Sequence, residues 1–405
     1  SSQDFGANTF YSAKFNNQFE ATRRFLASVS ADIKPLGTEQ FVISPTAYWH
    51  RDRDHYQLIR GKEGASNGEN WHRMDVYGAG INAHGSWFLG KTAVGMDVRK
   101  EHIVSTAYGD ALPENEWMDI SGSSRKFDHR GDRTNTSLFL EHNVILGGFT
   151  LSAGVLANRN TGLDNRFRFY PGVDLSYRPN DSWKFYASWN KALRVPTFTD
   201  LYTNNSVQTG DLSLRPEKNS TFKIGSRYRR MGFEATLTGF YSHGTDIIDW
   251  VYDTPDTRKY HAMNIGRLDN MGYSADAVFN IQELLPTAFV TRVKVGYAFI
   301  HQSHETDRDI YGSLYALEYL RHKATLQLDH RIWQRLSASW AVRWQERMNH
   351  YTPYTKVDVK LQWTAPTYSL YVKADNITCH RYYDLGSVLQ PGIWVMAGGS
   401  ITIGL

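Results

Sequence analysis

The chain has 405 residues, with 45 Lys and Arg against 41 Asp and Glu, a formal net charge of +4 and 14% aromatic residues. This balance gives no case for a nucleic-acid-binding protein, because no basic stripe or recognition helix accompanies it. A helical membrane span is excluded because no run of about 18 apolar residues occurs, whereas a mean hydropathy of -0.50 is compatible with β-strands that face lipid on one side and a polar lumen on the other.

Apolar and polar residues alternate with a period of two through almost the whole chain, which predicts about eighteen β-strands. The alternation is clearest late in the chain, where Val357, Val359 and Leu361 alternate with Lys356 and Asp358. Almost no stretch has the pattern of an amphipathic helix. The predicted strands cover residues 5–14, 20–33, 39–50, 71–83, 86–100, 133–146, 148–159, 168–178, 183–192, 218–230, 232–246, 262–282, 288–302, 320–333, 335–347, 354–365, 367–378 and 392–404.

The connections between these strands alternate between long and short. Long connections at residues 50–71, 101–132, 193–217, 303–319 and 379–391 alternate with short ones such as 84–86, 146–148, 231–232 and 334–335. One tight end and one elaborate end are typical of an outer-membrane β-barrel, and strands such as 149–158 reach the 9 to 11 residues or so that a membrane span needs. We therefore predict an all-β protein, a transmembrane antiparallel β-barrel that occupies residues 1–405 as one domain. A soluble β-sandwich is the alternative.

The polar connection at residues 190–218 is the most distinctive stretch. Its prolines cannot donate to a strand ladder, so it is predicted to be a loop between two antiparallel neighbours. The segments Arg194–Tyr202 and Leu214–Lys218 resemble the R-A/V-P-S/T-x-x-D/E-L-Y and L-x-P-E-K/R segments of TonB-dependent outer-membrane receptors. The residues that match this pattern are Arg194, Pro196, Leu201, Tyr202, Leu214, Pro216 and Glu217.

The two ends of the chain carry further resemblances. Residues 371–377, 381–383, 391–392 and 398–405 resemble the last hairpin of these receptors, although Leu405 stands where the family usually ends in an aromatic residue. The opening run Asp4–Phe15 resembles the cobalamin (vitamin B12) receptor branch. The resemblance therefore covers essentially the whole chain.

Several expectations follow from the resemblance. It implies a barrel of about 22 strands filled by an N-terminal plug. Because only about 18 strands are visible in the alternation, roughly four strands and the plug are expected to lie outside this chain. Ser1–Asp4 lacks the basic and apolar regions of a signal peptide, so we expect residue 1 not to start the precursor. The implied location is a Gram-negative outer membrane. The implied partners are the TonB-ExbB-ExbD complex, acting through the missing plug, outer-membrane lipids, a metal-chelate ligand and a surface lipoprotein, with no nucleic acid and no cofactor.

Aromatic residues in the long loops are the candidate ligand-binding residues, because large flat side chains with a polar tip give contact area at a small entropic cost. The same residues would also suit an interfacial aromatic girdle. They are Trp117, Trp250, Tyr252, Tyr260, Tyr311, Tyr315, Tyr351, Tyr354, Tyr382 and Tyr383.

No pattern indicates catalysis or a metal centre. The acidic group Glu114, Glu116 and Asp119 lacks the framework of a calcium loop and is expected to be solvated. The single cysteine, Cys379, is expected to be a buried or incidental thiol, and no Ser, His and Asp set has a nucleophile context. We therefore expect a protein that is not an enzyme.

The functional hypothesis is an outer-membrane active transporter that imports a scarce metal chelate with energy coupled through TonB. A corrinoid such as vitamin B12 is the favoured ligand, followed by a siderophore or haem. The first alternative is a passive outer-membrane porin, because about eighteen strands would suffice to close a barrel. An outer-membrane enzyme and a surface adhesin are the remaining alternatives.

Overall fold

The computed structural model describes residues 1–6, 17–37, 39–205, 207–254, 259–306, 310–314, 320–348, 351–383 and 389–402. Within these residues the chain forms one sheet of 21 strands, antiparallel apart from one two-residue strand that pairs in parallel, and a separate two-stranded hairpin. Three strands of the large sheet are two-residue strands in loops, which leaves eighteen strands in the wall. They are β6 (Asp110–Ala111), β13 (Gln208–Thr209) and β18 (Gly312–Ser313). The predicted number of strands is therefore confirmed.

The wall strands follow the order of the chain. They are β1 (Ser2–Phe5), β2 (Phe19–Ser30), β3 (Phe41–Gln57), β4 (Glu69–Trp87), β5 (Gly90–Ser105), β9 (His129–Leu146), β10 (Phe149–Asn160), β11 (Arg168–Tyr177), β12 (Trp183–Arg194), β14 (Glu217–Arg230), β15 (Phe233–Tyr252), β16 (Tyr260–Asn280), β17 (Val290–Glu305), β19 (Leu320–Trp333), β20 (Leu336–Arg347), β21 (Tyr354–Thr364), β22 (Tyr368–Asp375) and β23 (Trp394–Ile401). Each pairs with the next, from β1 with β2 to β22 with β23. In the described part of the chain no pairing joins β1 to β23.

The remaining elements are short and lie in the connections. They are β6 (Asp110–Ala111), β7 (Met118–Asp119), β8 (Lys126–Phe127), β13 (Gln208–Thr209), β18 (Gly312–Ser313), α1 (Phe198–Tyr202), α2 (Ile281–Leu284) and the 3₁₀ helices η1 (Ala65–Asn67) and η2 (Glu114–Glu116). No helix among the described residues is long and apolar enough to cross a membrane.

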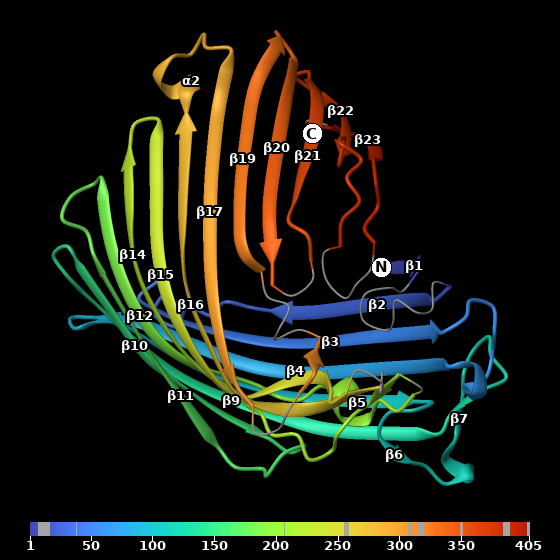
Figure 1. Ribbon diagram of the computed structural model, residues 1–405. Coiled ribbons are helices and arrows are strands. Elements are labelled where there is room, and N and C mark those ends of the chain that lie inside the picture. Colours follow the sequence, from blue (N-terminus) through green and yellow to red (C-terminus); the bar gives the residue numbers. More distant parts are fainter. Residues whose placement is uncertain are drawn as a thin grey trace.

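The curled sheet has a turn end and a loop end. Two-residue connections at 88–89, 147–148, 231–232 and 334–335 lie at the turn end, and the connections at 58–68, 106–128 and 195–216 lie at the loop end. Figure 1 shows the tight turns along the upper and left rim of the sheet and the longer connections towards the lower right. The predicted alternation of connection lengths is therefore confirmed.

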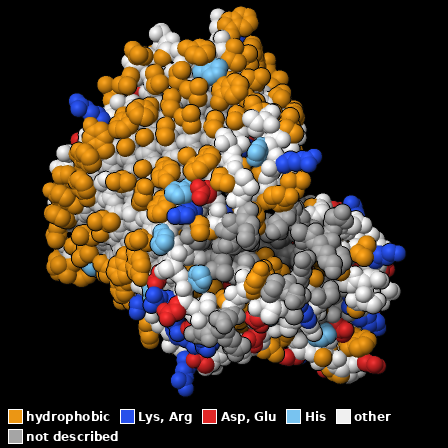
Figure 2. Space-filling model, viewed as in Figure 1, with side chains coloured by type: hydrophobic (Ala, Val, Ile, Leu, Met, Phe, Trp, Pro, Cys, Tyr) orange, Lys and Arg blue, Asp and Glu red, His pale blue; other side chains and the backbone are white. Residues whose placement is uncertain are grey.

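The register of the strands assigns every side chain to one of two faces. Trp49 lies opposite Tyr77, and Ile81 lies opposite Met96; these apolar residues mark the outward face. The alternate residues, such as Tyr48, Asn82 and Asp97, face the lumen. Figure 2 shows the resulting apolar surface over the strands, with the charged side chains gathered towards the loop end.

Some predicted boundaries differ from the structure. The first strand lies at Ser2–Phe5 rather than 5–14, and residues 7–14 of that prediction fall outside the described residues. β15 and β16 extend well beyond the membrane-length span into a ribbon of 20 and 21 residues, because their apolar loop-end residues pack under a folded loop. The predicted last strand ends at Ile401, and Leu405 lies outside the described residues.

β22 ends three residues earlier than predicted because the chain turns at Asn376. This residue has a positive φ of 54° and is 1% exposed. Its side-chain amide donates to the backbone oxygens of His380, at 3.0 Å, and Pro391, at 3.2 Å, and its Oδ1 accepts from the His380 N–H. Asn tolerates this conformation better than most residues, and its hydrogen bonds close the last loop. The neighbouring Cys379 is unpaired and exposed, so of the two expectations for this thiol, buried or incidental, the buried one is wrong.

Candidate functional site at the loop end

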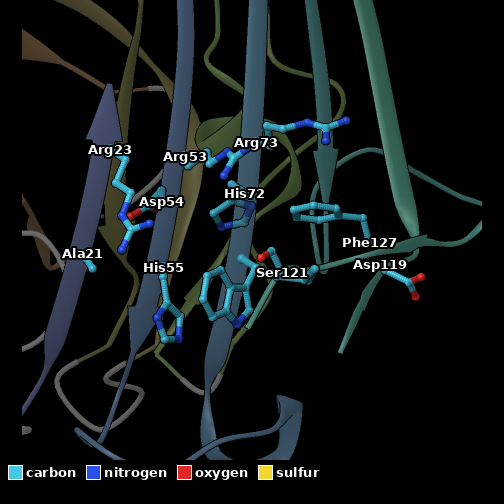
Figure 3. Close-up of a pocket in the computed structure, with 12 residues that line it drawn as sticks. Ala21, Arg23, Arg53, Asp54, His55, His72, Arg73, Asp119, Ser121 and Phe127 are labelled. Carbon is cyan, nitrogen blue, oxygen red and sulfur yellow. The ribbon is translucent and has the colours of Figure 1, made fainter. Parts of the chain in front are cut away.

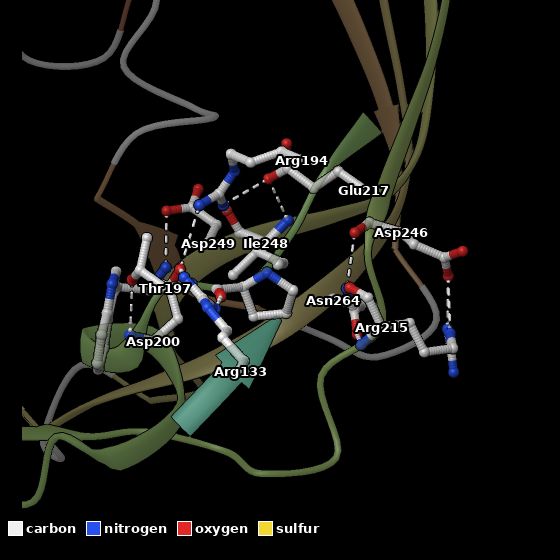
Figure 4. A network of polar contacts seen from close by, with 12 residues as sticks. Arg133, Arg194, Thr197, Asp200, Arg215, Glu217, Asp246, Ile248, Asp249 and Asn264 are labelled. Carbon is white, nitrogen blue, oxygen red and sulfur yellow. Dashed lines mark hydrogen bonds and ion pairs between the residues drawn. The ribbon is translucent and has the colours of Figure 1, made fainter. Parts of the chain in front are cut away.

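The loop after β12 is held by a network centred on Arg194. The guanidinium donates to Asp200 Oδ2 at 3.1 Å, to Glu217 Oε1 at 2.6 Å and to the Ile248 backbone oxygen at 3.2 Å. Glu217 Oε1 also accepts from the Ile248 N–H at 2.8 Å. Figure 4 shows these groups converging from β12, β14 and β15. We call Arg194, Thr197, Asp200, Glu217 and Ile248 the latch.

Helix α1 supplies the remaining bonds of the latch. Thr197 caps this short helix: its hydroxyl accepts from the Asp200 N–H at 3.1 Å, and Asp200 Oδ2 accepts from the Thr197 N–H at 2.9 Å. This reciprocal pair is a capping box. Asp200 therefore joins the helix start to Arg194, which explains why the family-like segment needs Thr and Asp three residues apart.

Arg133 connects the latch loop to a second part of the wall. Its Nη1 donates to the Pro196 backbone oxygen at 2.7 Å, its Nε donates to Glu101, and its guanidinium lies 4.5 Å from the ring centroid of Phe198. Pro196 is fully buried. The sequence indicated Pro196 but gave no signal for Arg133, because its partners come from β5 and from a loop more than 60 residues away.

The other motif residues form the apolar underside of the same loop. Leu214 packs with Ile248, Trp250 and Ala262, and Leu201 and Tyr260 lie against this cluster. Tyr202 stacks on Phe198 with ring centroids 6.2 Å apart, and Pro216 is buried. The structure thus brings all seven motif residues into one loop and its supports.

A stacked pair of rings links the latch loop to the loop after β5. His72 stacks on Tyr108 with centroids 4.2 Å apart, and its Nδ1 lies 2.7 Å from Ser105 Oγ. The Tyr108 hydroxyl lies 3.0 Å from the Thr203 hydroxyl. Burial, together with the nearby Arg125, lowers the pKa of His72 to about 3, so this imidazole stays neutral at the loop end.

Two carboxyl groups lie together on the lumen face at the loop end of β2 and β3. Burial and the adjacent Glu20 raise the pKa of Asp54 to about 8, and burial also raises the pKa of Glu20. Asp54 is therefore largely protonated near neutral pH, since two close carboxyl groups disfavour double ionisation.

The candidate aromatic residues fall into separate groups. Tyr252 contacts Tyr260, at 5.2 Å between centroids, and the 60% exposed Tyr311, at 5.6 Å. Tyr354 stacks on Tyr382 at 4.3 Å, and both are buried. Trp250 is 4% exposed in the core under the latch loop, whereas Trp117 and Tyr383 are exposed and Tyr351 is half-buried. Tyr315 lies outside the described residues. The two tyrosine groups remain predicted ligand contacts.

The lumen wall on β19 to β22 carries a row of cations that sequence patterning did not single out. Lys356 pairs with Asp358 at 3.3 Å and Lys373 with Asp375 at 2.9 Å. Lys323, Arg343 and Lys360 have no carboxylate partner among the described residues, and Lys360 Nζ lies 4.8 Å from the Tyr371 ring centroid. Over the described ranges, no group of three or more His, Cys, Asp or Glu is arranged to hold a metal ion.

Comparison with known proteins shows which solved structures share this fold. No curated protein matches the chain by sequence. Among solved structures, the FrpB iron transporter from Neisseria meningitidis in its apoprotein form superposes with a TM-score of 0.74 at 17% identity, over 98% of this chain and 67% of that one. The copper transporter OprC superposes with a TM-score of 0.73 at 14% identity, over 95% and 66%. The Serratia marcescens hemophore receptor HasR, in complex with its hemophore HasA and heme, superposes with 0.69 at 15% identity, over 95% and 66%.

These likenesses show the fold, and the chain spans about two thirds of the length of each structure. A family model described as "TonB dependent receptor-like, beta-barrel" matches residues 1–377. The family and its structural neighbours are receptors and transporters rather than enzymes. The chain therefore belongs to the TonB-dependent receptor β-barrel family, whose members are outer-membrane proteins of Gram-negative bacteria.

Proposed function

We propose that the chain forms the wall and mouth of an active transporter that imports a scarce metal chelate across the outer membrane, energised by the TonB-ExbB-ExbD complex. The observation that supports this most directly is the latch. It fixes the loop after β12 at the mouth through Arg194, Asp200 and Glu217. The cluster of Tyr252, Tyr260 and Tyr311 lies on the adjoining β15–β16 ribbon and the loop that pairs with it. A fixed loop frame with aromatic residues around it suits a receptor that captures a bulky ligand.

The barrel itself performs no covalent chemistry in this proposal. Energy coupling passes through a plug, which we expect to be encoded outside this chain and to be the element that TonB contacts. The barrel supplies a rigid wall because the ladder satisfies its backbone groups around the sheet. A surface lipoprotein that covers the mouth is a further proposed partner.

Two observations bear on the ligand. The opening run Asp4–Phe15 resembles the cobalamin-receptor branch, which puts a corrinoid first. The unpaired lumen cations Lys323, Arg343 and Lys360 favour a chelate with anionic groups, such as a ferric siderophore or haem. Structures with the same fold include iron, copper and hemophore receptors, which is consistent with a metal-bearing cargo.

Uptake assays would test the proposal and rank the ligands. The complete receptor is expressed in two otherwise identical hosts, one with TonB and one without, that lack their own receptors for the ligands tested. Uptake of labelled cyanocobalamin, a ferric catecholate siderophore and haemin is then measured at nanomolar concentration. We expect uptake of one ligand in the TonB-positive host only. Equal uptake in both hosts would overturn active transport and favour a passive channel.

A matched pair of variants would then test the lumen cations. Lys360→Gln removes an unpaired lumen charge, whereas Lys356→Gln removes one that Asp358 already neutralises. We expect the first change to weaken uptake of an anionic chelate more than the second. Equal effects would argue against recognition through the unpaired cations.

A further inference from the structure

Three arginines lie side by side across β2, β3 and β4. Arg23 is the register partner of Arg53, and Arg53 is the register partner of Arg73. Directly opposed residues of antiparallel strands have Cβ atoms only about 5 Å apart, and like charges at such positions are destabilising. Such a row is unfavourable unless an anion lies against it.

The arginine row faces outward, away from the lumen. Along the same faces of β3 and β4, the row Arg53 and Arg73 is followed by Arg51 and Asp75, and then by Trp49 and Tyr77. Arg24, one residue from Arg23, lies on the opposite face, where it pairs with Asp52 at 2.6 Å. The arginine row therefore belongs to the outer surface of the barrel and not to the transport path.

The row lies just above the apolar band. Four residues separate Arg73 from Tyr77 along β4, a distance of about 13 Å along the strand, or about 10 Å along the membrane normal at the usual strand tilt of about 40°. Trp49 and Tyr77, with rings 6.5 Å apart and nearly parallel, mark the interface. The arginine row is therefore at the height of the headgroups of the outer leaflet.

A pocket is built around the row. Its volume is about 220 Å³, and its lining includes the three arginines together with His55, Trp71 and Phe127. Figure 3 shows the three arginines coming from neighbouring strands, with Phe127 and Asp119 of the β7–β8 hairpin across the pocket. The hairpin is fixed there because Ile120 and Phe127 bury against Val104 on the outer face of β5.

The neighbouring acidic groups neutralise the row only in part, because Arg73 shares Asp75 with Arg51. Asp75 accepts from Arg51 at 2.6 and 3.1 Å and from Trp49 at 3.0 Å, and its nearest oxygen lies 3.5 Å from Arg73 Nε. Glu69 is bound to His55 and to the Gly64 N–H. Within the described residues Arg23 and Arg53 have no carboxylate partner, and the buried Arg73 Nε has no hydrogen-bond acceptor.

The surroundings of Arg73 add to this charge imbalance. Burial, with Arg51 and Arg53 close by, lowers the pKa of its guanidinium even though Asp75 opposes the shift. A phosphate or pyrophosphate group takes bidentate hydrogen bonds from arginine, so three arginines that line one pocket suit such a group.

We propose that Arg23, Arg53 and Arg73 form a binding site for the phosphate groups of an outer-leaflet lipid headgroup, with the β7–β8 hairpin as the upper wall of the pocket. The chemistry is that of a phosphate monoester or pyrophosphate, and the source is a membrane lipid rather than a soluble anion. The row faces outward and lies above Trp49 and Tyr77, at the height where lipid headgroups are confined. This position favours a membrane lipid over a soluble anion.

Lipid binding would be measured on the complete purified receptor in a nonionic detergent. The probes are lipopolysaccharide, the same lipopolysaccharide with its phosphates removed, and inorganic pyrophosphate. The variants are R23Q/R53Q/R73Q and, as a matched control on the lumen face, R24Q. Heat-modifiable electrophoretic migration would verify that each variant is a folded barrel.

We expect the unaltered receptor to bind the phosphorylated lipid at least about tenfold more tightly than the dephosphorylated one, the increment of one charge-assisted hydrogen bond. The triple variant loses this preference and R24Q keeps it. R53K, which retains charge without the bidentate geometry, is expected to fall in between. Equal preference in the triple variant and the unaltered receptor would overturn the site. Pyrophosphate binding as tightly as the lipid would overturn the assignment to a membrane lipid.

Discussion

The latch after β12 and the arginine row on β2 to β4 use the same residue type in opposite ways. Arg194 lies between two carboxylates, at 3.1 and 2.6 Å, and closes a loop of the same chain. Arg23 and Arg53 lie beside another arginine and have no carboxylate partner among the described residues. Charged groups that find partners within the chain therefore stabilise the fold, whereas a set without partners at the height of the lipid headgroups is free to bind a group from outside the chain.

The largest effect is expected at Asn376, a buried side chain whose amide nitrogen and oxygen both form hydrogen bonds. Asn376→Ala removes the hydrogen bonds to His380 and Pro391 and places a less tolerant residue at positive φ, which costs about 2–4 kcal/mol locally. Hydrogen exchange of residues 376–383 should become faster. Asn376→Gly keeps the backbone conformation and should lose only part of the protection; if the two variants exchange equally, the side-chain bonds alone hold the loop.

The latch is expected to give the next largest effect. Arg194→Ala leaves Asp200 and Glu217 without their cation, and because the Arg194 side chain is 42% exposed the cost is reduced to about 1–3 kcal/mol. Exchange of residues 195–205 should accelerate, and ligand uptake should fall. Arg215→Ala, at a 64% exposed ion pair with Asp246, is the matched control. Unchanged exchange in the Arg194 variant would contradict the role given to the latch.

A pH series would test the buried carboxyl pair on the lumen face. Because burial and Glu20 raise the pKa of Asp54 from 3.8 to about 8, the native state holds this proton more tightly than the unfolded state. The stability from that proton is complete below about pH 4 and is lost as the pH rises through about 8. Asp54→Asn should therefore protect β2 and β3 better than the unaltered chain at pH 9 and equally at pH 4, by hydrogen exchange.

The smallest effect is expected when a carboxylate is introduced into the arginine row. Arg53→Glu converts two like-charge cross-strand pairs into opposite-charge pairs and should stabilise the lipid-free barrel by about 0.2–1 kcal/mol. Thermal unfolding in detergent without phosphorylated lipid would measure this, with Arg53→Gln as an intermediate control. A lower unfolding temperature for the glutamate variant would show that repulsion between the arginines is not significant.

The sequence alone determined the all-β architecture, the number of wall strands and the two unequal ends. Period-two alternation and turn residues are local signals, so the tight turns at 147–148 and 231–232 could be located without knowing which strands pair. The Arg194–Tyr202 and Leu214–Lys218 segments also marked the loop that became the latch.

Tertiary structure alone decided what those residues contact. Arg133 joins Pro196 across 63 positions of the chain, and the burial of Trp250 depends on a loop that returns over β15 and β16. The arginine row has no sequence signature, because Arg23, Arg53 and Arg73 become neighbours only through the register of three strands. A one-residue shift in that register would turn their side chains to the opposite face, so only the folded sheet fixes which charges meet the membrane.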